Sequence, residues 1–152
     1  AWASGGAAAY NKKIWQELGG FDEIFAPFYF EDIDISFRAL KAGYEILWEP
    51  KAKVKHEHET TIKRSFSKGY VARVQQRNQL LFIWKNISDP KLKKDHRINL
   101  AKRLFGGMGF GYWIPFLWAL LKWNRLPRRF APCNDDGDLM RSDLEAINYA
   151  SS

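Results

Sequence analysis

Three carboxylates crowd the start of one predicted helix, and this segment constrains the fold more than any other part of the chain. Glu31, Asp32 and Asp34 lie within four residues, directly after an aromatic loop that contains Pro27. Apolar residues then recur at helical spacing, and Gly43 stands where a glycine commonly ends a helix. We therefore predict a helix that opens on Asp32 or Asp34 and ends near Gly43.

A carboxylate at a helix N-terminus has two possible roles. It faces free backbone N–H groups and the positive end of the helix dipole, which lowers its pKa and fixes its rotamer. It can therefore cap the helix, or it can project into a cleft as a general base. Spacing alone favours capping, and different carboxylates of this group could fill both roles.

The rest of the chain is predicted to mix helices and short strands. Asn11 is a suitable N-cap, and Gly19 with Gly20 ends the helix that follows it. A longer helix is expected to begin at Ser65 or Ser67. The predicted helices span 12–18, 67–86, 91–103 and 142–149, and the predicted strands span 1–10, 44–48 and 52–56.

Charge is distributed unevenly along the 152 residues. The net charge is −4 over residues 1–50, +15 over 51–129 and −4 over 130–152. A basic middle between acidic ends predicts an anionic partner: a phosphate-bearing ligand, an anionic membrane or nucleic acid. The single cysteine, Cys133, excludes an intramolecular disulfide framework and a multi-cysteine zinc site, and it fits a reducing compartment.

An ordered set of short motifs covers residues 4–86 and resembles the C-terminal half of a family 2 glycosyltransferase with the inverting GT-A fold. Five independent motifs coincide at the expected spacings, which makes the set more specific than any one piece. The matching pieces are Gly5-Gly6-Ala7, Gly19-Gly20-Phe21-Asp22-Glu23, Glu31-Asp32-x-Asp34, Arg38, Ala42-Gly43-Tyr44, Pro50, His56, Tyr70 and Arg77-Asn78.

The resemblance implies a role for each carboxylate of the predicted helix. Asp32 matches the catalytic base, which takes a proton from an acceptor hydroxyl as that oxygen attacks the anomeric carbon of a nucleotide-sugar. Glu31 would help to hold the acceptor, a glycan or a lipid-linked sugar. Asp34 is expected to be structural, in the first helical turn.

Four further residues are substrate-binding candidates. Gly20 and Asp22 are similar to the family's acceptor-side loop, although a helix stop followed by an Asx-turn explains them equally well. Arg77 and Asn78 correspond to a region near the acceptor and the donor diphosphate. For Arg77, a solvated basic helix face is the alternative.

The same resemblance implies a divalent cation, Mg²⁺ or Mn²⁺, that bridges the donor pyrophosphate. His56 matches the third protein ligand of this metal, and we prefer it to His58. The nucleotide-binding strands and their Asp-x-Asp metal motif lie upstream of the matched region in such enzymes. We therefore expect the chain to be a fragment that is inactive alone, with most metal ligands outside it.

The segment Leu104–Leu121 has no charged residue, but glycines and Pro115 interrupt it and basic residues flank both ends. These features suit a helix lying on an anionic membrane surface and, equally, a helix packed on protein. By analogy with enzymes of cell-envelope polysaccharide synthesis, we expect a cytoplasmic protein at the inner face of the membrane.

The sequence thus predicts an α/β fold. Residues 1–88 would form the acceptor-side half of a GT-A domain with a partial sheet and flanking helices, and residues 89–152 a basic and apolar helical extension. An incomplete sheet has an open edge, which favours pairing with a second copy. The alternative function is a non-catalytic acceptor- or membrane-docking module. No nucleic-acid partner is expected, because the aromatic residues fall at core spacings and no recognised motif is present.

Overall fold

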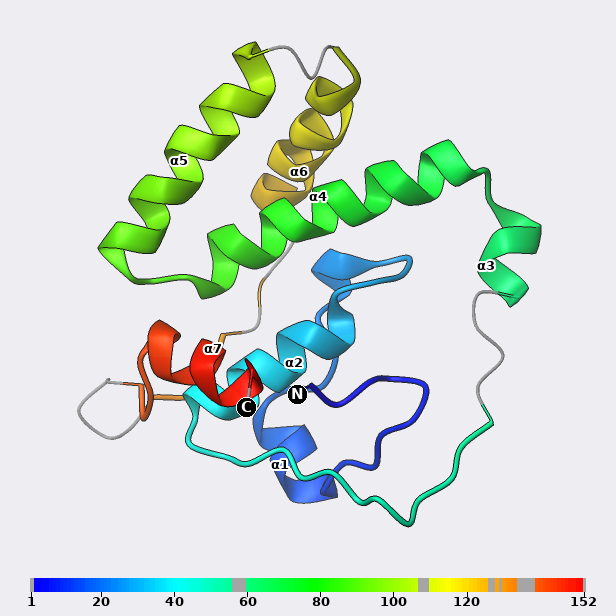
Figure 1. Cartoon of the computed structure of the whole chain (residues 1–152), viewed down its shortest axis with the longest axis vertical. Helices are drawn as coiled ribbons and strands as arrows, with labels where there is room; N and C mark the ends of the chain where they lie inside the picture. Colours follow the sequence, from blue (N-terminus) through cyan, green and yellow to red (C-terminus); the bar gives the residue numbers. More distant parts are fainter. Residues whose placement is uncertain are drawn as a thin grey trace.

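A computed structural model describes residues 2–55, 60–106, 110–125, 128, 130–133 and 139–151. Within these ranges the chain forms helices and loops, and no strand (Figure 1). The elements are α1 (Lys12–Glu17), the 3-10 helix η1 (Glu23–Phe25), α2 (Glu31–Lys41), α3 (Thr60–Ser65), α4 (Lys68–Asn86), α5 (Pro90–Phe105), the 3-10 helix η2 (Phe110–Tyr112), α6 (Trp113–Arg125) and α7 (Asp143–Ser151).

The predicted α/β fold with a partial GT-A sheet is therefore wrong for the described residues. Residues 2–10, 44–48 and 52–55 form no strand. A strand satisfies its backbone groups by pairing with another strand, and no described segment pairs with these. Leu47 and Trp48 are instead 82% and 83% exposed, in a long connection that runs around one side of the molecule toward α3 (Figure 1).

The predicted helices are confirmed, within a residue or two at their ends. Asn11 caps α1, because its Oδ1 accepts hydrogen bonds from the backbone N–H groups of Lys13 and Ile14 at 2.9 and 3.3 Å. Ser67 caps α4, and Asp89 caps α5 directly before a proline. The helix of the three carboxylates begins at Glu31, one residue earlier than predicted.

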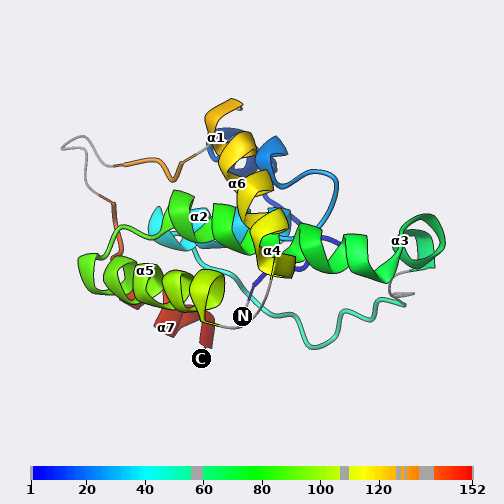
Figure 2. The ribbon, with the colours of Figure 1, turned by 90° about the horizontal axis from the view of Figure 1, so that it is seen from above.

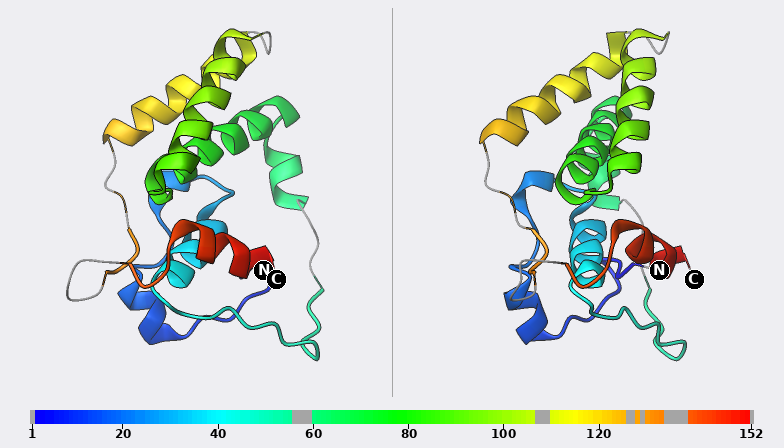
Figure 3. Two further views of the ribbon diagram at one scale, coloured as in Figure 1. Left: turned by 60° about the vertical axis from the view of Figure 1, so that its left-hand side comes forward. Right: turned by 90° about the vertical axis from the view of Figure 1, so that its left-hand side faces the viewer.

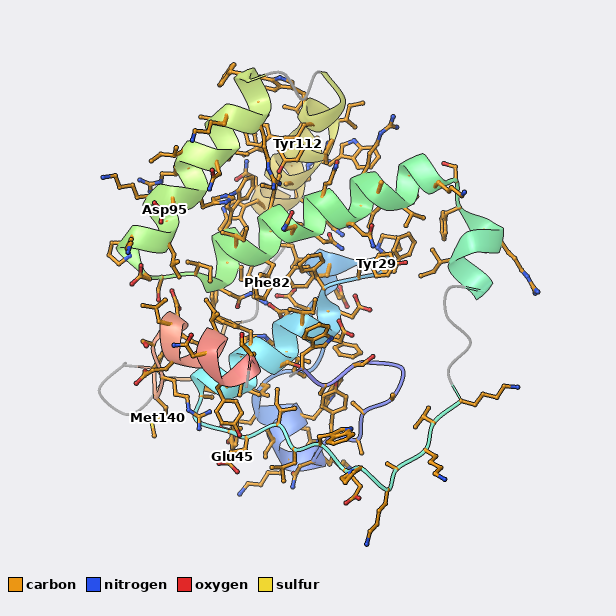
Figure 4. All side chains as sticks on the ribbon, viewed as in Figure 1. Tyr29, Glu45, Phe82, Asp95, Tyr112 and Met140 are labelled. Carbon is orange, nitrogen blue, oxygen red and sulfur yellow. The ribbon has the colours of Figure 1, made fainter. Side chains whose placement is uncertain are left out.

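Helix α4 lies at the centre of the fold. Helices α5 and α6 pack on one side of it, and α2 with α7 lies on the other (Figures 1 and 3). Viewed from above, α6 crosses over α4 and α5 lies beside them (Figure 2). Two apolar clusters fill these contacts, and Phe82 of α4 belongs to both (Figure 4). The first is built on Ile24, Phe25, Leu80, Leu81, Tyr112 and Ala119, and the second on Phe37, Leu40, Ile87 and Ala146.

The apolar segment Leu104–Leu121 does not form one helix. It covers the end of α5, the turn that contains η2, and most of α6. Pro115 and Ala119 are buried, so one side of α6 packs on protein. This packing agrees with the alternative in which the segment forms a helix packed on protein. Among the described residues, no helix has the length and apolar character that crossing a membrane requires.

A buried carboxylate fastens α7 to the rest of the fold. Asp143 accepts hydrogen bonds from Nζ of Lys41 in α2 and, at 2.6 Å each, from the backbone N–H groups of Ser88 and Asp89. Burial by itself raises the pKa of Asp143, but these hydrogen bonds and the Lys41 charge hold that pKa below its ordinary value. The ionised form of Asp143 therefore stabilises the folded chain.

We expect Asp143→Asn to lower the free energy of unfolding at neutral pH by about 3 kcal/mol, because the Lys41 ammonium stays buried without its partner. The stabilisation from Asp143 is complete above the ordinary aspartate pKa and is lost as pH falls through the lowered folded-state pKa. Urea unfolding over a range of pH measures both effects. Asp95→Asn is the control, since Asp95 lies on the outer side of α5 (Figure 4). Equal losses in the two variants would contradict this role.

Candidate functional site

The loop that leads into Glu31 has a strained backbone. Tyr29 and Phe30 have φ angles of 70° and 76°, in the left-handed region that residues other than glycine rarely adopt. Phe30 is also the N-cap of α2 and offers no side-chain hydrogen bond to it. Strain of this kind persists only where surrounding contacts impose it, and it is concentrated at functional sites. The loop thus fixes where α2 begins and where its first carboxylates lie.

Asp32 is half-buried in the first turn of α2. Its Oδ1 accepts a hydrogen bond from the N–H of Ile33 at 2.8 Å, and its Oδ2 accepts one from the N–H of Gly5 at 3.1 Å. These contacts fix the rotamer of Asp32 and tie the N-terminal segment to α2. A carboxylate accepts about four hydrogen bonds, so both oxygens keep capacity for a substrate hydroxyl.

Glu31 lies beside Asp32 and is only partly satisfied. Its Oε2 is buried and has no hydrogen-bond partner within the described residues. Burial, together with the charge of Asp32, raises the pKa of Glu31 above its ordinary value. Burial and the two carboxylates also raise the pKa of Tyr10, whose hydroxyl donates to the carbonyl of Ala3 at 2.9 Å. The start of α2 therefore concentrates negative charge where solvent screens it poorly.

Three aromatic rings pack together beside these carboxylates. Tyr10 and Phe21 each meet Trp15 edge to face, with ring centroids 4.9 and 4.8 Å apart. Phe21 also approaches Gly5, the residue that donates to Asp32. The site thus combines two acidic groups with an apolar, aromatic surface. Neither of the two pockets described, between α4 and α5 and beside α6, is lined by Glu31 or Asp32.

Gly20 and Asp22 make the local contacts expected of a helix end followed by an Asx-turn, the alternative to a role in acceptor binding. Gly20 has φ +69°, and a Cβ atom there would lie 3.0 Å from the ring of Trp15. The Oδ1 of Asp22 accepts from the N–H of Ile24 at 3.0 Å, and its Oδ2 lies 2.7 Å from Nζ of Lys85. Contact of Gly20 or Asp22 with an acceptor stays a prediction.

Asp34 is fully buried in an ion-pair cluster that joins three parts of the fold. Its carboxylate accepts from Nε of Arg38 at 2.8 Å and from Nζ of Lys85 at 2.7 Å. Arg38 also donates to the carbonyls of Leu18 and Gly20, at the end of α1. Asp34 therefore connects α2, α4 and the glycine loop, and it is enclosed away from any substrate.

The sequence reasoning missed Lys85. Burial lowers its pKa, although the charge of Asp34 and hydrogen bonds to Asp22 and Asp34 oppose that shift. The sequence did contain a sign that Lys85 is buried. Lys85 is the only charged residue between 78 and 88, in a largely apolar part of the predicted helix. A lone charge in such a stretch indicates a buried partner of opposite sign.

Arg77 and Asn78 both hold the strained loop. The Nδ2 of the fully buried Asn78 lies 2.7–2.9 Å from three loop carbonyls, those of Phe25, Phe28 and Tyr29. Arg77 donates from Nε to Oδ1 of Asn78 at 2.9 Å and from NH2 to the carbonyl of Ala26 at 2.6 Å. Both residues are thus positioning residues for the start of α2. Direct contact with a donor or acceptor stays a prediction.

The predicted metal ligand, His56, lies outside the described residues, as does His58. In the part of the chain that the structure describes, no three His, Cys, Asp or Glu side chains come together as a metal site would require. These residues therefore do not fit the divalent cation by themselves, and Mg²⁺ or Mn²⁺ binding stays a prediction.

Comparison with known proteins decides the family. Residues 1–131 match the family described as Glycosyl transferase family group 2, which is most of the chain. The chain belongs to this family. The predicted resemblance to family 2 glycosyltransferases is confirmed.

One curated protein to which the chain is similar is the O-antigen chain rhamnosyltransferase WbaN of Salmonella anatum. The two are 36% identical over 63 residues, which is 40% of this chain and 19% of the relative. The chain thus matches about a fifth of the relative's length. No solved structure matches it.

A pair of glycine substitutions tests the turn at Gly20. Gly20→Ala is expected to lower the free energy of unfolding by about 1–3 kcal/mol, because of its positive φ and the contact with Trp15. Gly69→Ala is the matched control, since nothing lies within 4 Å of its added methyl group in α4. The control should be neutral or stabilising by up to about 1 kcal/mol. Urea unfolding that ranks the two variants in the opposite order would refute the assigned turn.

Glu31→Gln tests the electrostatics of the site. A raised folded-state pKa means that ionised Glu31 opposes folding, so the neutral amide should raise the melting temperature at pH 7. The gain should vanish as pH falls below the ordinary glutamate pKa, where both folded and unfolded chains carry a neutral carboxyl group. Differential scanning calorimetry at several pH values measures it. Glu45→Gln, at an exposed position, should show no such gain; an equal gain would contradict the assignment.

Proposed function

We propose that this chain carries the acceptor-side catalytic residues of an inverting glycosyltransferase in polysaccharide synthesis. The donor is a nucleotide-sugar, and the acceptor is a hydroxyl of a glycan or lipid-linked sugar. Membership of the family supports glycosyl transfer. The name of the relative, an O-antigen chain rhamnosyltransferase, supports polysaccharide as the product class.

Asp32 is the general base of this proposal. As the acceptor oxygen forms its bond to the anomeric carbon, its proton passes to the Asp32 carboxylate. The bond from that carbon to the phosphate oxygen breaks on the opposite face, and the nucleoside diphosphate leaves with the electron pair. Hydrogen bonds from Gly5 and Ile33 hold the carboxylate in one orientation while this happens. Because attack comes from the face opposite the leaving group, the configuration inverts.

Glu31 orients the acceptor beside Asp32. Its raised pKa increases the fraction of the carboxyl form, which can donate a hydrogen bond to one sugar oxygen while accepting from another. The observation that carries the proposal is the Oε2 atom of Glu31. This atom is buried, and it has no hydrogen-bond partner within the described residues. Glu31 directly precedes Asp32, the proposed base. A buried polar atom without a partner is destabilising, and a bound hydroxyl would satisfy it.

The proposed donor site involves residues that the structure does not describe. We propose that the intact protein binds the nucleotide-sugar with a divalent cation, and that His56 is one of the ligands. Arg77 and Asn78 contribute by holding the loop in front of Glu31. We place the reaction at the cytoplasmic face of the membrane, where lipid-linked acceptors are available.

Asp32→Asn in the intact protein tests the base. We expect the turnover of sugar transfer to fall by roughly 10²–10⁴-fold, because the amide cannot take the proton. The affinity for the nucleotide-sugar, measured by calorimetry, should stay unchanged. Asp95→Asn on the outer face of α5 removes one carboxylate elsewhere and should keep full turnover. Unchanged turnover in Asp32→Asn would refute the proposal.

A further inference from the structure

Helix α6 has a second apolar face that nothing in the described structure covers. Pro115 and Ala119 are buried on the side facing the core. On the other side, Ile114, Leu117 and Leu121 are 37%, 49% and 53% exposed. Their spacing of three and four residues places them in one line along the helix. We call these three residues the outer stripe.

A basic pocket adjoins the C-terminal end of the outer stripe. It has a volume of about 330 Å³, and Leu121 belongs to both features. Its other lining residues are Arg77, Trp118, Lys122 and Arg125. Three cationic side chains and a tryptophan thus line one shallow, open depression whose exposed surface is mostly apolar, beside a row of exposed aliphatic side chains.

The cations of this pocket have no direct carboxylate partner within the described residues, although the charge of Asp22 acts on Lys122. Within the described residues, no ion pair joins Arg77, Lys122 or Arg125 to a carboxylate. Instead, Lys122 and Arg77 each donate to the carbonyl of Ala26, at 2.6 Å. Burial and the charge of Arg77 lower the pKa of Lys122 to about 8, against an opposing effect of Asp22. A bound anion would offset both the burial of Lys122 and its repulsion by Arg77.

We propose that the basic pocket binds the phosphate group of an anionic membrane lipid while the outer stripe lies among the lipid acyl chains. Arg and Lys side chains bind phosphate through charge-assisted hydrogen bonds, and Trp118 fits the boundary between headgroups and chains. A free phosphate would use the cations alone and leave the stripe in water. A lipid uses both features, and α6 would then lie in the plane of the membrane surface. This proposal does not depend on the role of Asp32.

The surface of α5, next to α6, carries positive charge that is complementary to an anionic membrane. Helix α5 lies beside α6 (Figures 1 and 2). Its exposed charged side chains are all basic apart from Asp95. Phe105, at the end of α5, is itself 77% exposed. An anionic leaflet attracts basic side chains within a Debye length of its surface. The α5–α6 side of the molecule therefore faces the membrane in this proposal.

Vesicle co-sedimentation tests the pocket. The protein should bind vesicles of phosphatidylcholine with phosphatidylglycerol, and should stay in solution with phosphatidylcholine alone. The double variant Lys122→Gln, Arg125→Gln should weaken binding by roughly thirtyfold, as expected for two charges at the surface. The matched control Lys51→Gln, Lys53→Gln removes two exposed charges in the long connection before α3 and should change binding less than about threefold. Far-UV circular dichroism confirms that each variant is folded, and Arg125→Gln alone retains the Lys122 hydrogen bond to Ala26.

A second pair of variants tests the outer stripe. Leu117→Ser with Leu121→Ser should weaken vesicle binding by at least about tenfold, because it removes apolar area from the lipid. Leu144→Ser with Ile147→Ser changes two exposed apolar residues of α7 and should leave binding unchanged.

Four results would overturn the proposal. They are equal binding to both kinds of vesicle, an equal loss of binding in the variants and their controls, binding of inorganic pyrophosphate in the pocket without vesicle binding, and a change of oligomeric state in the stripe variant without a change in vesicle binding. The last two would assign the surface to a free phosphate or to a second copy of the chain.

Discussion

The ion pairs of Asp34 hold the candidate site together. One fully buried carboxylate binds Arg38 of its own helix and Lys85 of α4, and Arg38 in turn binds the carbonyls that end α1. Removing one partner from such a cluster leaves an uncompensated buried charge, which is strongly destabilising. The glycine loop, the start of α2 and the middle of the fold therefore keep one relative position. Asp34 faces inward, while Glu31 and Asp32 on the same helical turn stay partly exposed.

The sequence predicted the helices well, since their signals are local. Asn11, Ser67 and Asp89 are caps whose hydrogen bonds depend only on the next few residues. The strands were predicted wrongly, because alternation of apolar residues shows only that a segment is suited to a sheet. A sheet also needs a neighbouring strand, and the described residues provide none for 44–48. Leu47 and Trp48 thus show the apolar pattern of a strand without its pairing.

The candidate site was predicted in part, for a similar reason. The carboxylates at the start of α2 and the glycine turn are adjacent in the chain, so short motifs could identify them. The contacts of Lys85 and Asn78 with residues about fifty positions earlier depend on how α4 packs, which no local pattern encodes. Arg77 and Asn78 were predicted to bind substrate, and this stays a prediction; their observed contacts are with each other and with the loop backbone. The family match supports the chemistry, and the three-dimensional contacts show how the loop is supported.

The carbonyl oxygen of Ala26 connects the loop before α2 with helices α4 and α6. It accepts one hydrogen bond from Arg77 of α4 and another from Lys122 of α6, so two helices share a single peptide oxygen. The peptide lies in the loop that ends at Glu31. A ligand that draws either cation toward itself would weaken its hydrogen bond to this carbonyl oxygen. If such a ligand also moved Glu31 and Asp32, its binding beside α6 and the position of these two carboxylates would be linked, and each would alter the other's equilibrium by an equal factor.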